Sequence, residues 1–174
     1  MGKCPANFFR RDFGKNLSSK KKSLKFRSMA VNSSLQFKKI VVPIDFSKIS
    51  QKALNQAVAF AKQSKATLVL IHVVTFSIAA SVEQFSVIDW YQRLIKDAKK
   101  NLEKLKQGLD SSISAEIIVE TGVPFDVICK IAKKKKADLI VVTTHGYSGL
   151  KHAILGSTAE RVIRHASCPV LVIR

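Results

Sequence analysis

Residues 143–158 combine glycines with hydroxyl side chains at a spacing that could bind phosphate. The residues concerned are Gly146, Gly149, Gly156, Ser157 and Thr158. An apolar run precedes this segment, and a helical pattern follows it. Glycines let a ligand approach the main chain, and free backbone N–H groups at the start of a helix attract anions. The segment therefore suggests an anion site, although glycines and hydroxyl caps also occur where a loop only has to turn.

Three more candidates lie near the ends of apolar runs. Asp45 follows the run K-I-V-V-P-I, while His72 and Val73 lie near the end of T-L-V-L-I-H-V-V. In an open α/β sheet, ligands bind beyond the carboxyl ends of the strands, where the strand order reverses. We therefore expect these residues beside the glycine-rich loop. A structural interpretation stays open as well, in which Asp45 caps the first helix and Ser157 caps the fourth.

Signatures of other chemistries are missing from the sequence. It contains no P-loop G-x-x-x-x-G-K-[ST], no G-x-G-x-x-G after the first strand and no G-x-S-x-G elbow. The four histidines form no H-x-x-x-H pair on one helix, so we expect no metal site. They are His72, His145, His152 and His165. We also expect no catalytic residue, because no general base, metal triad or arginine finger can be recognised.

Five short apolar runs, rich in β-branched residues, alternate with helical patterns. The runs span residues 39–44, 67–74, 115–120, 138–144 and 169–174. Continuous runs of this kind are typical of strands covered on both faces. Strands that alternate with helices require right-handed crossovers. The sequence therefore predicts an α/β protein with a five-stranded, mostly parallel, doubly wound sheet and helices on both faces.

Four amphipathic helices are expected between these strands. The first follows a Ser47 cap, and the second carries leucines at four-residue spacing from Leu94. The third opens with Pro124, and the fourth begins after Gly156. Residues 75–89 fit no period, and we expect them to form an insertion before the second helix.

Positive charge is concentrated at the start of the chain. The chain has 174 residues and a formal net charge of +18. Residues 1–36 hold nine basic residues and one acid without any hydrophobic period, which predicts a disordered tail. Three alternatives remain for this tail: a misassigned extension upstream of Met29, an organellar transit peptide, or an arm that contacts nucleic acid or acidic lipid.

Residues 37–174 are expected to form the folded domain. No uncharged apolar run approaches the roughly 20 residues that span a bilayer, which argues against a transmembrane protein. The three cysteines, Cys4, Cys129 and Cys168, cannot all pair and show no C-x-x-C spacing. A disulfide framework and a four-cysteine zinc site are therefore excluded. A cytoplasmic location is expected, because the cytosol keeps thiols reduced.

Several stretches together carry a family resemblance. They are K-K-I-V-V-P-I-D-F-S, A-T-L-V-L-I-H-V-V and the C-terminal part from Ala137 onwards. Through them, residues 38–174 resemble the universal stress protein (UspA-like) family. The ATP-binding members of that family carry G-x2-G-x9-G-[ST] after the fourth strand. The matching positions here are Thr143, Gly146, Gly156 and Ser157, so threonine replaces the first glycine while the spacing is intact.

The resemblance implies a Rossmann-like fold of the adenine nucleotide alpha hydrolase type, with ATP as the ligand. Asp45 and Val73 would face the adenosine end, Val73 through its backbone. The residues that would hold the phosphates and ribose are Gly146, Gly156, Ser157 and Thr158.

The final apolar strand, with no charge before Arg174, predicts an edge that pairs with a second copy. The resemblance likewise implies a homodimer through this C-terminal strand. Two functions stay open. One is a regulatory module that binds ATP in the stress response and hydrolyses it slowly at most. The other is a nucleotide-independent dimeric interaction protein. No membrane partner is expected, and a nucleic-acid partner is less favoured.

Overall fold

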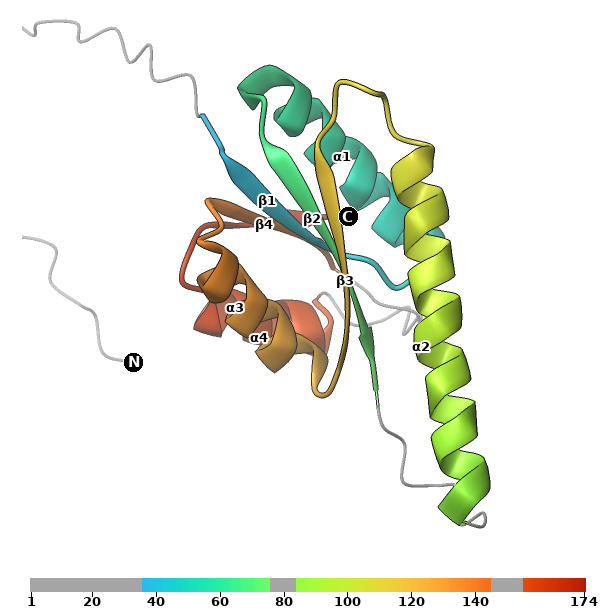
Figure 1. Cartoon of the computed structure of the whole chain (residues 1–174). Coiled ribbons are helices and arrows are strands. Elements are labelled where there is room, and N and C mark those ends of the chain that lie inside the picture. The colour runs from blue at the N-terminus through green and yellow to red at the C-terminus, as the bar shows by residue number, and fades with distance from the viewer. Residues whose placement is uncertain (1–35, 76–83, 145–154) are drawn as a thin grey trace, which may run out of the picture. The chain divides into compact units, whose positions relative to one another are not determined.

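A computed structural model describes residues 36–75, 84–144 and 155–174 (Figure 1). The chain divides into two units, residues 1–32 and 33–174, and everything described belongs to the second. Apart from Gln36, the tail predicted over residues 1–36 lies outside the described residues. The elements in chain order are β1 (Lys39–Pro43), α1 (Lys48–Ser64), β2 (Thr67–Val74), α2 (Gln84–Gln107), β3 (Ala115–Thr121), α3 (Pro124–Lys135), β4 (Leu139–Thr143), α4 (Ser157–His165) and β5 (Val170–Ile173).

The five strands form one sheet in the order β3-β2-β1-β4-β5. Every neighbouring pair is parallel, which confirms the predicted fold class. The chain moves outward from β1 through β2 to β3, then returns to the other side of β1 to form β4. The order therefore reverses between β1 and β4, and the site of ligand binding in such sheets lies beyond the carboxyl ends of these two strands.

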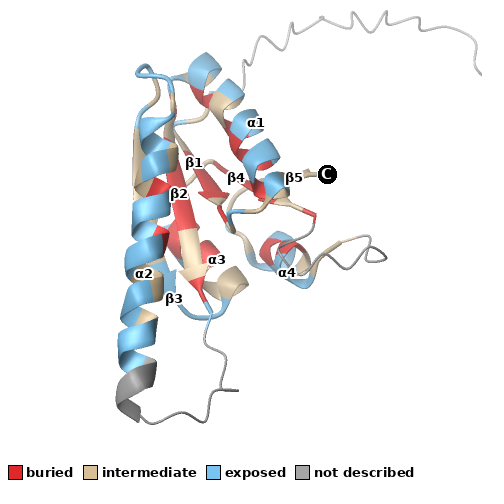
Figure 2. Ribbon diagram, turned by 90° about the vertical axis from the view of Figure 1, so that its right-hand side faces the viewer, coloured by how far each residue is buried: buried red, intermediate tan, exposed pale blue. Residues whose placement is uncertain are grey.

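Helices cover both faces of the sheet, α1 and α2 on one side and α3 and α4 on the other (Figure 1). Alternate residues of β1 enter different cores: Ile40 and Val42 pack with α1, while Val41 packs with α3 and α4. Buried residues are concentrated in the strands and on the helix sides that face them (Figure 2). Burial on both faces explains why the sequences of the central strands are continuous apolar runs.

The prediction of an insertion over residues 75–89 is wrong in its second half. Residues 84–89 form the first turns of α2, while residues 76–83 lie outside the described residues. Ile88 and Trp90 are 55% and 51% exposed, so these two apolar residues do not add to the buried stripe of the helix. Exposed apolar residues obscure the helical period in a sequence pattern.

A helix that crosses a bilayer must be long and predominantly apolar. Within the part of the chain that the structure describes, no helix is long and apolar enough to cross a membrane.

Candidate functional site

A cavity of about 740 Å³ opens at the carboxyl ends of β1, β2 and β4, beside the start of α4. Of the seven residues that the family resemblance implies for the ligand site, six line it: Asp45, Val73, Thr143, Gly156, Ser157 and Thr158. The seventh, Gly146, lies outside the described residues. The cavity thus sits where the strand order reverses, which is the location expected of a ligand site in this architecture.

Asp45 forms one polar wall of the cavity. The Ser47 backbone N–H donates to Asp45 Oδ1 at 3.0 Å. Ser47 is the N-cap of α1 as predicted, since its side chain accepts a hydrogen bond from the Ser50 N–H at 3.1 Å. Asp45 is therefore not the cap, and the structural interpretation of this residue is wrong. Asp45 nevertheless lines the cavity.

The charge of Asp45 is stabilised by its neighbours. Burial opposes ionisation, but hydrogen bonds from Ser47 and Ser50 outweigh it and lower the pKa of Asp45. Asp45 is consequently a carboxylate at neutral pH. A carboxylate only accepts hydrogen bonds, so it suits hydroxyl or amino groups of a ligand and repels phosphate.

Phe46 and His72 form an aromatic wall of the cavity, of which the sequence analysis predicted His72 and missed Phe46. Their ring centroids lie 4.7 Å apart at an interplanar angle of 35°. Phe46 has a backbone φ of 62°, a conformation that costs a bulky residue free energy and that concentrates at functional sites. The His72 ring is fixed from the other side, because its Nδ1 donates to the Ile44 carbonyl oxygen at 2.7 Å.

The start of α4 forms the opposite polar wall. Its N-cap is Gly156, which has no side chain to cap the helix, so the interpretation that Ser157 caps it is wrong. The first intrahelical bond runs from the Glu160 N–H to the Gly156 carbonyl at 3.0 Å. The backbone N–H groups of Ser157, Thr158 and Ala159 precede that bond and adjoin the cavity. The positive end of the helix dipole adds to their attraction for an anion.

Thr143 ends β4 in an extended conformation and is paired with Ile173 of β5. It is not among the described non-glycine residues with positive φ, which are Phe46, Lys65 and Lys136. A glycine at this position would therefore provide space rather than a special backbone angle. The threonine is half-buried and borders the cavity, so its effect on a ligand is steric.

The third side of the cavity comes from α2 and the start of α3. The contributing residues include Trp90, Leu94, Asn101 and Pro124. Sequence reasoning missed the α2 wall because a helical period does not show which strand ends the helix passes. As for metals, the described residues contain no group of three or more His, Cys, Asp and Glu side chains that could hold an ion.

Comparison with known proteins places the chain in a family. The model of the universal stress protein family matches residues 36–174. The chain belongs to the universal stress protein family. Universal stress protein MJ0531 of Methanocaldococcus jannaschii is 39% identical over 142 residues, which cover 79% of this chain and 82% of that protein. The solved structure of UspA from Lactobacillus plantarum has a TM-score of 0.71 and 28% identity, and the match covers 80% of this chain and 99% of that one.

Two more distant universal stress protein structures contain nucleotides. One was solved in complex with cAMP and matches with 24% identity and a TM-score of 0.54 over 80% of this chain and 98% of that one. The other, from Archaeoglobus fulgidus, was solved in complex with dAMP, with 21% identity and a TM-score of 0.52 over 79% and 98%. These likenesses show the shared fold, and the nucleotides belong to those two proteins.

Proposed function

We propose that the protein is a regulatory module of the stress response that binds ATP in the cavity between β1, β4 and α4. The observation that carries the proposal is the pairing of two opposite electrostatic walls within one cavity. The N–H groups at the start of α4, which precede its first intrahelical bond, suit phosphates, and the Asp45 carboxylate suits hydroxyl or amino groups. A nucleoside triphosphate carries phosphates at one end and hydroxyl and amino groups at the other.

The size and lining of the cavity agree with this assignment. Small-molecule sites in proteins usually enclose about 300–1,000 Å³, and this cavity falls within that range at about 740 Å³. Phe46 and His72 provide a flat apolar surface next to Asp45, which suits a base or a ribose. The complexes of two relatives with cAMP and dAMP support the choice of an adenine nucleotide.

The direct test is titration calorimetry of the full chain with ATP, after mass spectrometry of the denatured protein has shown whether nucleotide copurifies. Asp45→Ala should weaken ATP binding about tenfold, because it removes one or two charge-assisted hydrogen bonds. Asp110→Ala is the matched control, since Asp110 is an exposed aspartate that pairs with Lys62 away from the cavity. It should leave the affinity unchanged. Absence of heat with the unaltered chain at millimolar ATP would reject the proposal.

The alternative function is a nucleotide-independent dimeric interaction protein. One observation favours it: Thr143 lines the cavity at a position where the ATP-binding pattern has glycine. Under this alternative the chain keeps its fold and its dimer contact, and neither Thr143 nor Asp45 affects any ligand.

Both functions include a homodimer through β5. This strand is an edge of the sheet, and its four residues, Val170–Ile173, are apolar and only half-buried. An apolar edge strand with unpaired backbone groups favours pairing with a second copy. Light scattering at micromolar concentration should give twice the mass of the chain. A monomer mass at that concentration would contradict the dimer.

A further inference from the structure

The strand β3 forms the second edge of the sheet, and among the described residues it pairs only with β2. The Leu68 N–H donates to the Ser114 carbonyl oxygen, and the Gly122 N–H donates to the Val74 carbonyl oxygen. The backbone N–H and C=O groups of successive residues point to alternate sides of a strand. Since Ser114 and Gly122 bond to β2, the even-numbered residues between them also direct their N–H and C=O groups toward β2. The odd-numbered residues therefore direct theirs outward. They are Ala115, Ile117, Val119 and Thr121.

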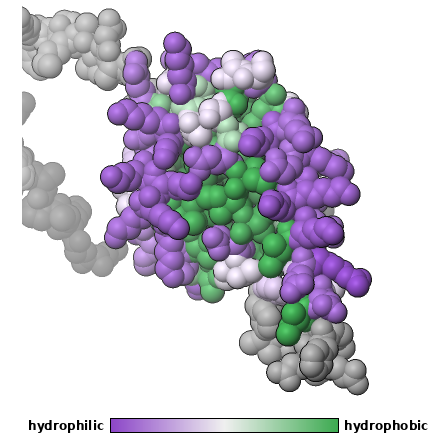
Figure 3. Space-filling model, viewed as in Figure 1, coloured by the Kyte–Doolittle hydropathy of each residue, from purple (hydrophilic) through white to green (hydrophobic). Residues whose placement is uncertain are grey.

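The side chains of this edge are apolar along most of its length. Residues 115–119 are half-buried, and Ala115, Ile117 and Val119 reach the core beneath α2 while Ile118 reaches the core beneath α3. A continuous apolar region accordingly occupies the middle of the face seen in Figure 3, with hydrophilic residues on both sides of it. A row of outward backbone groups beside apolar side chains fits an added β-strand.

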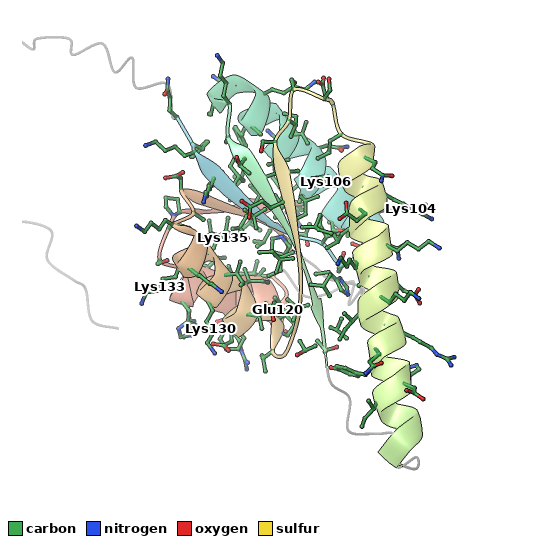
Figure 4. The ribbon with its side chains drawn as sticks, viewed as in Figure 1. Lys104, Lys106, Glu120, Lys130, Lys133 and Lys135 are labelled. Atoms are coloured by element: carbon green, nitrogen blue, oxygen red, sulfur yellow. The ribbon has the colours of Figure 1, made fainter. Side chains whose placement is uncertain are left out.

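Lysines are numerous on the two helices beside this edge, and Lys106 of α2 and Lys135 of α3 lie nearest to the strand (Figure 4). Lys104 and Lys106 project from α2, and Lys130, Lys133 and Lys135 project from α3. Lys135 pairs with Glu116 and Lys130 pairs with Asp126. Within the described part of the chain, the other three lysines take part in no ion pair.

Glu116 shows how closely the two sets of lysines approach the strand. The pKa of its carboxyl is lowered chiefly by a hydrogen bond from Lys135, and further by the charges of Lys39 and Lys106. Lys106 belongs to the helix on one face of the sheet and Lys135 to the helix on the other. The edge of β3 therefore lies between two positively charged borders.

We propose that the edge of β3 binds an extended acidic segment of a partner protein, which adds to the sheet as a further strand. The outward backbone groups would pair with the main chain of the segment, and its acidic residues would meet the lysines of α2 and α3.

Other occupants fit this edge less well. A second copy of the chain would bring lysines against lysines. The chain's own residues 1–36, with nine basic residues and one acid, would be repelled in the same way. A nucleic acid has no peptide N–H and C=O groups that could pair with the outward backbone groups of the strand, and its charged backbone would not cover the apolar side chains of the edge.

The test uses the full chain and a nine-residue peptide with alternating Val and Thr in its central five positions and two Glu at each end. Amide hydrogen exchange is followed by NMR at peptide concentrations up to about 1 mM. We expect the amides of Ile117 and Val119 to become at least about tenfold more protected on binding. Those of Glu116 and Ile118 should keep their rates, because they already bond to β2. This alternation is a signature that non-specific charge attraction does not produce.

Two control peptides separate the two parts of the proposal. In the first, N-methylation of alternate central residues blocks backbone pairing on one side of the peptide. In the second, Lys replaces Glu at the ends. Both should bind at least about tenfold more weakly. Equal binding of the methylated peptide, or of the Lys peptide, would overturn the proposal, as would the absence of alternating protection with the Glu peptide.

A pair of protein variants tests whether the lysines act locally. Lys106→Glu with Lys135→Glu should weaken peptide binding about tenfold. Lys48→Glu with Lys52→Glu changes the net charge by the same amount on α1, away from this edge, and should change binding by less than about twofold. Thermal melting checks that both variants fold. Binding of a DNA duplex that depends on Lys106 and Lys135, without peptide binding, would also overturn the proposal and assign the lysines to nucleic acid.

Discussion

Polar groups at one end of the sheet bond to each other, whereas those at the other end line a cavity. At the amino ends of the strands, the Asp138 carboxylate accepts hydrogen bonds from the backbone N–H groups of Lys38 and Lys39 at 2.7 and 2.8 Å. At the carboxyl ends, Asp45 and the start of α4 point into a cavity. One end uses its polar groups to join β1 to β4, whereas the other lines a cavity with polar groups, where we propose that ATP binds.

This difference shows how one architecture separates stability from binding. Polar groups that bond to each other add to the free energy of unfolding and leave nothing to recognise a ligand. Polar groups at the reversal of the strand order contribute less to the fold, and the loops there can change without disturbing the sheet. Mutations at the amino ends of the strands should consequently change the free energy of unfolding, whereas mutations at the carboxyl ends should change ATP affinity.

The largest expected effect is that of Gly156→Val on ATP affinity. The backbone of Gly156 has φ −70° and ψ 149°, which any residue adopts, so valine fits the fold. Its branched side chain would however stand at the start of α4 and keep a phosphate from the N–H groups. Titration calorimetry should show affinity reduced at least about 100-fold, with little change in melting temperature.

A glycine at the opposite end provides the control for that variant. A Cβ added at Gly108 would meet the carbonyl oxygens of Lys104 and Leu105 at 3.5 and 3.6 Å, which are ordinary contacts. Gly108→Ala should therefore leave ATP binding unchanged. If Gly156→Val binds ATP as tightly as the unaltered chain, the phosphates do not lie at α4.

The next effect is a loss of stability without a loss of binding. Asp138→Ala removes the acceptor for two backbone N–H groups and should lower the free energy of unfolding by about 1.5 kcal/mol. For a chain of this size the melting temperature should fall by roughly 3–6 °C. Asp138→Asn keeps one acceptor oxygen and should recover part of the loss. A marked change in ATP affinity in either variant would contradict the separation of the two ends.

The smallest effect is expected for Thr143→Gly. Because Thr143 has extended backbone, glycine gains only space in the cavity, and ATP should bind about threefold more tightly. The same change should cost about 1 kcal/mol of stability, since glycine weakens a strand. Thr121→Gly, at the end of β3, is the control that should cost stability alone. Unchanged affinity in Thr143→Gly would show that the threonine side chain does not border the ligand.

Much of the fold followed from residue patterns alone. Continuous β-branched runs marked all five strands because each lies between two layers of helices. Ser47 was recognisable as a cap, since a hydroxyl residue before an amphipathic period is a local signal. The reversal of strand order explains why residues as distant in sequence as Asp45 and Ser157 meet at one cavity.

The remainder depends on contacts that leave no local signal. The left-handed conformation of Phe46 arises where β1 must turn into α1, and phenylalanine is not a residue that indicates such an angle. Its ring contact with His72 joins the turn after β1 to β2, two segments that meet only in space. The first turns of α2 were missed because the apolar residues Ile88 and Trp90 are exposed there and obscure the helical period.

The strand order has a consequence for how strongly a partner can be held. The edges β3 and β5 lie on opposite sides of the sheet. In the proposed dimer, two β5 strands meet at the centre and the two β3 edges face outward at the ends of one continuous sheet. A partner with two acidic segments joined by a linker long enough to reach both edges would bind the second segment as an intramolecular step. Its avidity would then depend on linker length as well as on the contacts at each edge.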